Sequence, residues 1–233
     1  MIVYGFHAVL ARLRRSPASF RELLLDASRD DARMRDLVRA AQDAGLRPVG
    51  VDSHRLDRLC PQRRHQGVVA FVDEAAPVAS LDDLLDQCEG PPFLVLLDGV
   101  TDPRNLGACL RVADGAGVNA VVAPKDRACA LTEVALQTAS GAAESVPYVM
   151  VTNLARTLDD LQERGIWTVG AVDDADRPLY SARLTGALAL VLGAEGRGLR
   201  RLTRERCDEL ARIPLQGHVE SLNVSVAAGI CLF

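Results

Sequence analysis

The sequence predicts an α/β protein in which a small α/β unit precedes a larger domain built on a mostly parallel sheet. In the larger part, short apolar runs alternate with helical segments, an order that favours parallel strands joined by helices. One run, Phe93–Leu97, is apolar at every position, which is typical of a strand buried on both faces. The polar and small residues of Asp73–Ala79 indicate a linker. We therefore expect units at residues 1–72 and 80–233, joined by residues 73–79.

The first unit is predicted to contain two helices and three strands. Phe6–Leu13 has a helical pattern, and a second helix follows Arg33 and ends at Gly45, because glycine commonly ends a helix. The predicted strands are Phe20–Leu25, Pro48–Val51 and Val68–Val72. A unit of about 70 residues buries only ~60% of its surface, so it should be marginally stable alone.

The second unit is predicted to open with a short helix at Leu81–Cys88. A longer helix should begin at Asp102-Pro103, because aspartate caps helices and proline suits their first turn. Its core stripe is Leu106, Cys109, Leu110 and Ala113. Further strands are expected at Ala120–Ala123, Val146–Val151, Trp167–Val172, Leu188–Leu192 and Ala211–Ile213, and a last helix should open at Ser221.

Charge and composition limit the partners of this chain. Its formal net charge of −4 argues against indiscriminate binding of polyanions, so a specific nucleic-acid partner would need local basic patches. Solvated helix faces explain each candidate patch about equally well. The candidates are Arg12, Arg14 and Arg15; Arg63 and Arg64; and Arg197, Arg200, Arg201, Arg204 and Arg206.

The six cysteines lie far apart without a CxxC pair, which disfavours a zinc site and a disulfide framework. The four histidines are too scattered to form a metal site. Met1–Tyr4 does not begin a signal peptide, and no apolar run approaches the ~20 residues of a membrane span. We expect a cytoplasmic protein with neither a membrane nor a metal as partner.

Two predicted strand ends lead into loops that carry glycines and polar groups. The first loop places Glu195 among Gly193, Gly196 and Gly198, and the second contains Gln216-Gly217. In open α/β sheets, ligands bind at the carboxyl ends of strands. The glycine order is GxxGxG, whereas the fingerprint of dinucleotide-binding loops is GxGxxG. The sequence therefore disfavours a dinucleotide as the ligand of this loop.

Arg111 is a candidate for substrate contact because it lies off the apolar stripe of its helix. Its side chain should lean toward the helix start, where Gly107 is expected to leave room. Asn105 lies in the first turn, so both residues could address one anionic or hydroxyl-bearing substrate at the helix N-terminus. The alternative is an exposed arginine and a second capping residue.

The last loop adds two further polar candidates. Ser221 can cap the last helix, whereas Asn223, two residues into an apolar helix, should need a polar partner. Four positions at the ends of strands and loops could surround a flat adenine with apolar side chains and main-chain hydrogen bonds. They are Val172, Gly193, Ile213 and Leu222.

Three blocks resemble the three motifs of the SpoU (TrmH-type) RNA 2′-O-ribose methyltransferases of the SPOUT superfamily. They are Asp98–Arg111, Leu192–Gly198 and Ile213–Val226. The resemblance extends through Ser140–Pro147 and Arg63–Gly67, and it spans nearly the whole chain. It is closest to the bacterial branch that methylates a guanosine of large-subunit ribosomal RNA.

The resemblance implies a C-terminal trefoil knot and a ribosomal-protein-like RNA-binding unit at the N-terminus. It implies S-adenosylmethionine as cofactor, bound at the four positions named above. It gives Arg111 the central catalytic role, with Asn105, Glu195, Ser221 and Asn223 positioning Arg111 and the ribose. The residues expected to contact ribosomal RNA are Arg63, Arg64, His65, Arg104 and Arg197.

The resemblance also favours a homodimer built through the last helix. Small residues would allow close approach of a second chain, and an apolar stripe offers contact area, although packing on the chain's own sheet explains both equally well. The small residues are Ser221, Ser225, Ala228 and Gly229, and the stripe is Leu222, Val226, Ile230 and Phe233.

Two departures from the family pattern and two alternative functions stay open. Gln137 stands where many relatives carry a basic residue, and relatives usually continue beyond Phe233, so we expect a longer natural chain. The alternatives are a transfer-RNA ribose methyltransferase and a non-catalytic RNA-binding assembly factor. The N-terminal unit disfavours the first, and the intact motif residues disfavour the second.

Overall fold

The computed structural model describes residues 1–61, 65–73 and 80–233, and these residues form two compact units. The first holds the described residues up to Asp73 together with Ser140–Ser145. The second holds Ser80–Ala139 and Val146–Phe233. The predicted boundaries at 72 and 80 stay a prediction, and Arg63, Arg64 and most of the predicted linker lie outside the described residues.

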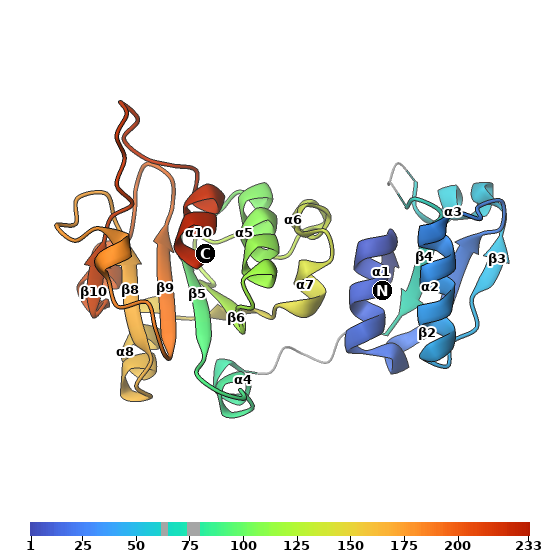
Figure 1. The fold of residues 1–233 in the computed structure, drawn as a ribbon, viewed down its shortest axis with the longest axis horizontal. Helices are drawn as coiled ribbons and strands as arrows, with labels where there is room; N and C mark the ends of the chain where they lie inside the picture. The colour runs from blue at the N-terminus through green and yellow to red at the C-terminus, as the bar shows by residue number, and fades with distance from the viewer. Residues whose placement is uncertain (62–64, 74–79) are drawn as a thin grey trace. The chain divides into compact units, whose positions relative to one another are not determined.

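The first unit is a four-stranded sheet with helices (Figure 1). The sheet order is β1-β4-β2-β3; β4 runs antiparallel to β1 and β2, and β3 runs parallel to β2. The strands are β1 Ile2–Tyr4, β2 Phe20–Asp26, β3 Val49–Val51 and β4 Val68–Val72. The helices are α1 Phe6–Arg15, the 3-10 helix η1 Pro17–Ser19, α2 Ala32–Asp43 and α3 Ser53–Leu59.

The predicted helices and strands of this unit are confirmed, and three elements are new: β1, η1 and α3. The strand β1 is only three residues long, too short for a clear alternation of apolar and polar residues. The helix α3 buries only Leu56, so its sequence lacks an apolar stripe. It forms because Asp52 caps it, accepting a hydrogen bond from the backbone N–H of His54 at 2.6 Å.

The second unit is built on a six-stranded sheet in which every neighbouring pair is parallel. The strand order is β10-β8-β9-β5-β6-β7, which confirms the predicted α/β class with a mostly parallel sheet. The strands are β5 Phe93–Asp98, β6 Ala120–Pro124, β7 Tyr148–Val151, β8 Trp167–Ala171, β9 Leu188–Gly193 and β10 Glu209–Ala211.

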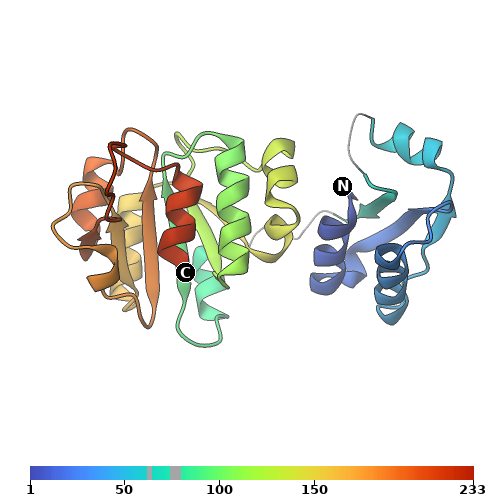
Figure 2. The same ribbon diagram turned by 45° about the horizontal axis from the view of Figure 1, so that its top comes forward.

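Helices cover both faces of this sheet. Figures 1 and 2 show α5, α6 and α10 side by side on one face, and α8 packs on the other through a core that contains Leu94 and Leu96. The helices of this unit are α4 Leu81–Asp86, α5 Pro103–Gly115, α6 Glu133–Ala139, α8 Leu154–Glu163, the 3-10 helix η2 Leu179–Ser181, α9 Arg201–Arg206 and α10 Val224–Leu232. The short helix α7 Ala142–Ser145 belongs to the first unit.

Two predicted boundaries near the C-terminus are wrong. The strand β10 ends at Ala211, two residues earlier than predicted, because only Glu209–Ala211 pairs with β8. The helix α10 begins at Val224 rather than at Ser221. Asn223 caps it, because its Oδ1 accepts hydrogen bonds from the backbone N–H and the hydroxyl of Ser225 at 3.0 Å and 2.6 Å. The residues between β10 and α10 therefore form one long loop.

Three further features of the described residues bear on function. None of their helices has the length and apolar character needed to cross a membrane. All six cysteines are free thiols. Among the described residues, no group of three or more histidine, cysteine, aspartate or glutamate side chains is placed to hold a metal ion.

Candidate active site

A cavity of about 270 Å³ lies at the carboxyl ends of β8 and β9 and beside the loop that precedes α10. All four predicted cofactor-binding positions line it, and they arrive from separate segments of the chain. These positions are Val172, Gly193, Ile213 and Leu222. The cavity thus occupies the edge of a parallel sheet where ligands of open α/β proteins bind.

The loop that follows β9, residues 194–199, folds back on itself and, together with Gly193, forms one wall of this cavity. The backbone N–H of Gly198 donates to the carbonyl of Ala194 at 2.8 Å. A Cβ on Gly193 would lie 2.2 Å from the carbonyl carbon of Gly198, so only glycine permits this close approach. Gly196 also has a positive φ of 71°, which disfavours any side chain there. The glycines therefore shape the wall.

Glu195, in the loop after β9, connects the three sequence motifs through hydrogen bonds. Its Oε1 accepts hydrogen bonds from Asn105 Nδ2 at 3.0 Å, from Asn223 Nδ2 at 2.5 Å and from the backbone N–H of Val224 at 3.3 Å. Asn223 Nδ2 also donates to Asn105 Oδ1 at 2.9 Å. The predicted polar partner of Asn223 is thus present, although Asn223 caps the helix rather than lying within it.

Ser221 lies in the loop and lines the cavity, so it is not the helix cap that the sequence suggested. Within the described part of the chain it makes no hydrogen bond. Its hydroxyl is exposed and available to a ligand in the cavity.

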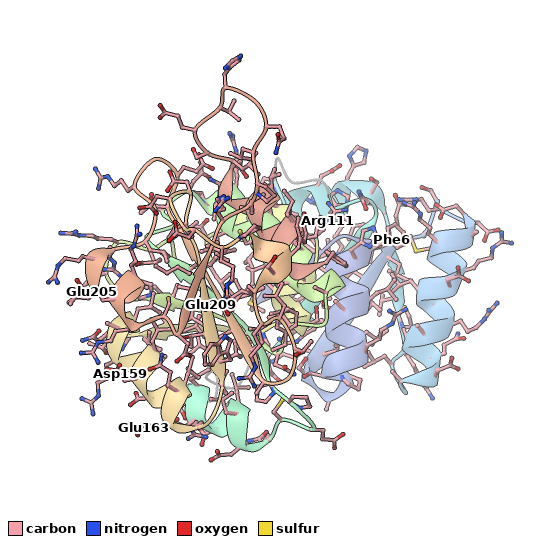
Figure 3. All side chains as sticks on the ribbon, turned by 60° about the vertical axis from the view of Figure 1, so that its left-hand side comes forward. Phe6, Arg111, Asp159, Glu163, Glu205 and Glu209 are labelled. Carbon is pink, nitrogen blue, oxygen red and sulfur yellow. The ribbon has the colours of Figure 1, made fainter. Side chains whose placement is uncertain are left out.

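Arg111 lies on α5, where its side chain is exposed (Figure 3). It is not among the residues that line the cavity, and it forms no hydrogen bond or ion pair with the residues the structure describes. The prediction that Gly107 leaves room for it is wrong, because α6 occupies that space. A Cβ on Gly107 would lie 2.4 Å from the carbonyl oxygen of Ala135.

The comparison with known proteins decides the family. The SpoU rRNA Methylase family matches residues 92–233, more than half of the chain. The chain belongs to this family. A second family, described as RNA 2′-O ribose methyltransferase substrate binding, matches residues 2–78. The resemblance inferred from the three motifs is confirmed.

The matches to three individual relatives cover from 65% to 100% of the chain. A protein of Ralstonia nicotianae named 23S rRNA (guanosine-2′-O-)-methyltransferase RlmB is 56% identical over 232 residues, which are 100% of this chain and 93% of that protein. The crystal structure of the SpoU methyltransferase AviRb from Streptomyces viridochromogenes in complex with the cofactor AdoMet has a TM-score of 0.76 at 25% identity, over 100% of this chain and 87% of that chain. A TrmH/SpoU tRNA modifying enzyme of A. aeolicus matches 65% of this chain and 78% of its own, with a TM-score of 0.56 at 27% identity.

The basic group around α9 of this SpoU protein is largely neutralised by carboxylates. Arg201 pairs with Glu205, and Arg206 pairs with Asp159 (Figure 3 labels both acids). The remaining pairs are Arg204 with Asp174 and Arg200 with Asp98. Of the predicted RNA contacts in this unit, the exposed Arg104 and Arg197 make no ion pair among the described residues.

Two basic candidates of the first unit are buried. Arg12 is held by the hydroxyl of Ser19 at 2.9 Å and the carbonyl of Asp73 at 3.0 Å. His65 accepts a hydrogen bond from the backbone N–H of Gly67 at 3.1 Å, and its Nε2 lies 2.9 Å from Asp57 Oδ1. Both side chains therefore contribute to the stability of the unit, and the contact of His65 with RNA stays a prediction.

A buried thiol and a buried carboxylate complete the surroundings of the site. Burial, and secondarily the charge of Glu195, raises the pKa of the Cys109 thiol to about 12, which leaves it protonated at neutral pH. Asp98 ends β5 and is buried against Arg200, which begins the segment after the glycine loop. The sequence analysis missed Asp98, although a carboxylate directly after a buried apolar run is a usable signal.

Proposed function

We propose that this protein transfers a methyl group from S-adenosylmethionine to the ribose 2′-hydroxyl of a guanosine in large-subunit ribosomal RNA. The observation that carries the proposal is the meeting of the three motifs, through Glu195, beside a cavity at the carboxyl edge of the sheet. Full-length relatives with the guanosine-2′-O-methyltransferase name support the choice of substrate.

The cavity suits the cofactor through its shape and its lining. Apolar side chains of Val172, Ile213 and Leu222 can enclose a flat adenine, and the backbone at Gly193 can offer hydrogen bonds to its edge. When bound, S-adenosylmethionine supplies an electrophilic methyl group. The protein then has to align the acceptor hydroxyl with that group, and alignment alone can account for several kcal/mol of catalysis.

Arg111 is proposed to stabilise the ribose oxygen as it loses its proton. A guanidinium stays protonated in proteins, so a literal general-base role conflicts with its chemistry. A planar fork of donors suits a developing alkoxide and the adjacent phosphate. Asn105, Glu195 and Asn223 hold one another, and we propose that with Ser221 they position the ribose and Arg111.

We propose a homodimer that completes each site. Arg111 does not line the cavity of its own chain, so we propose that a second chain brings its Arg111 to that cavity. Val226 on the helix α10 is 51% exposed, Phe233 directly after the helix is 85% exposed, and an added Cβ on Gly229 would meet no atom within 4 Å. This apolar and open side fits a two-fold contact between identical helices. The small residue Ala228, by contrast, is fully buried in its own chain, so it does not belong to that surface.

The first unit is proposed to recruit RNA. Residues 1–72 contain 13 arginines and 8 acidic residues, a formal charge of +5, whereas residues 73–233 contain 14 basic and 23 acidic residues, a formal charge of −9. Arg63 and Arg64 remain proposed contacts, with Arg104 and Arg197 near the chemistry. We also propose the division at residues 72 and 80, the trefoil knot and a cytoplasmic location.

The direct test uses purified protein, S-adenosylmethionine with a labelled methyl group, and protein-free large-subunit ribosomal RNA. We expect the label in 2′-O-methylguanosine after digestion to nucleosides, and the matching site should lose its methyl group in cells that lack the protein. Label on a base, or label only in transfer RNA, would refute the proposal. The A. aeolicus tRNA enzyme matches only 65% of this chain, which disfavours the transfer-RNA outcome.

A further inference from the structure

We propose that Asp98 is a positioning residue for cofactor binding, acting through Arg200 on the loop that walls the cavity. The inference rests on the proposed function, because it assigns a role within the same site. Asp98 is the last residue of β5, and it lies next to Gly193, the last residue of β9, in the parallel register of the sheet. It thus stands at the point where the glycine loop leaves the sheet.

The side chain of Asp98 is 0% exposed, and both of its oxygens bind Arg200. Oδ2 accepts a hydrogen bond from the backbone N–H of Arg200 at 2.9 Å, and Oδ1 accepts one from Arg200 Nε at 2.5 Å. A buried carboxylate is tolerated only when it is paired and hydrogen-bonded. Among the described residues, Arg200 supplies every hydrogen bond to this carboxylate.

The position of Arg200 makes this pair relevant to the cavity. Every residue from Gly193 to Leu199 lines the cavity, and Arg200 follows directly. The loop leaves the sheet beside Asp98 and returns to Asp98 through Arg200, so one carboxylate fixes its far end. Glu195 is the second fixed point, because Asn105 and Asn223 hold it. Losing the contact between Asp98 and Arg200 should let this wall of the cavity move, while the hydrogen bonds of Glu195 remain.

A competing role for Arg200 is contact with RNA, as part of the basic group on α9. The two roles predict different measurements, because a loop that shapes the cavity affects the cofactor, whereas a phosphate contact affects RNA. Arg201 is a matched control. It is the next residue, carries the same charge and pairs only with Glu205 one turn away on the exposed side of α9.

The test compares full-length Asp98→Asn, Arg200→Gln, Arg200→Lys and Arg201→Gln. The dissociation constant for S-adenosylmethionine is measured by calorimetry without RNA, and KM is measured for ribosomal RNA. We expect Asp98→Asn and Arg200→Gln to weaken cofactor binding by roughly tenfold, the scale of one charge-assisted hydrogen bond. Arg200→Lys should recover part of the loss, and Arg201→Gln should bind like the wild type. The KM for RNA should stay within about twofold of wild type for the two Arg200 variants.

Wild-type cofactor affinity in Arg200→Gln would overturn the inference, and so would an RNA KM that rises while cofactor affinity holds. Because Arg200 is 40% exposed, its variants test the idea even if the buried Asp98→Asn substitution prevents folding. The wild-type measurement separates the two proposals. A wild-type protein that does not bind S-adenosylmethionine contradicts the proposed function, whereas wild-type binding that the variants retain contradicts only the role of Asp98.

Discussion

Arg111 should act on the cavity of the partner chain, and mixed dimers can test this. Arg111→Ala leaves the cavity intact, because Arg111 does not line it. Gly193→Val leaves Arg111 intact and damages the cavity, since its Cβ would lie 2.2 Å from the carbonyl carbon of Gly198. Each variant alone should be inactive. Loss of one hydrogen-bond donor to the transition state lowers kcat about 100-fold. The residual activity of Arg111→Ala should therefore be about one hundredth of the wild-type rate, and this is the background of the experiment.

The two variants are co-expressed with different affinity tags, and mixed dimers are isolated through both tags. In a two-fold dimer with shared sites, one site of each mixed dimer combines an intact cavity with an intact Arg111. Methyl transfer per dimer should therefore reach about half of the wild-type rate, roughly 50 times the background. Transfer is measured with labelled cofactor and ribosomal RNA.

The reciprocal control places both substitutions on one chain and pairs it with a wild-type chain. If the sites are shared, each site of this dimer contains one damaged component, and activity should fall to background. If Arg111 works within its own chain, the wild-type chain keeps a complete site, and about half of the activity remains. Activity in the control and none in the first mixture would refute the shared site. Recovery of either mixed dimer shows that the variants fold and assemble.

Four further outcomes are expected. Arg111→Lys keeps the charge without the planar fork and should be nearly inactive in methyl transfer, with an unchanged melting temperature because the side chain has no described partner. Gly107→Ala places a Cβ 2.4 Å from the backbone of α6 and should cost about 1–3 kcal/mol of unfolding free energy in urea titration. Residues 80–233 alone should still bind S-adenosylmethionine in calorimetry while RNA affinity and its salt dependence fall. Val226→Arg should give monomers in light scattering with the fold retained by circular dichroism, whereas Ala228→Arg should unfold the chain because Ala228 is buried.

The elements that the sequence predicted well depend on local patterns. Apolar runs such as Phe93–Leu97 become strands of the parallel sheet, and Asp102 caps α5 as expected, accepting from the backbone N–H of Arg104 at 2.7 Å. The four positions around the predicted adenine site line one cavity, since strand ends in a parallel sheet meet at one edge. Each of these predictions needed only residues close in sequence and the general geometry of the fold.

The errors arise where distant residues decide. The sequence suggested free space next to Gly107 for the side chain of Arg111. In the structure α6 fills that space, and no local sequence pattern reveals the position of α6. The arginines around α9 looked like one basic patch, yet Arg200 pairs with a carboxylate 102 residues away. Ion pairs with carboxylates that are distant in sequence neutralise arginines that lie close together in the sequence.

The cap of the last helix shows how a close alternative is resolved. Both Ser221 and Asn223 are good capping residues, and local propensity barely separates them. Glu195, 28 residues earlier, accepts from the Asn223 amide and from the Val224 backbone N–H, and this fixes the chain at that position. The helix cap therefore lies two residues later, at Asn223, and Ser221 is left exposed beside the cavity.

The charge distribution gives a reason for the two-unit design. Residues 73–233, with a formal charge of −9, repel RNA at a distance, and Arg104, Arg111 and Arg197 are among the described arginines there that make no ion pair. Screening limits that repulsion to about 10 Å at 0.1 M salt, so these arginines can still act once RNA is close. We therefore expect recruitment to come from the unit of charge +5, as proposed above. Under this proposal, separating recruitment from chemistry lets the acidic part of the chain repel RNA that the first unit does not hold, so charge alone contributes to selectivity.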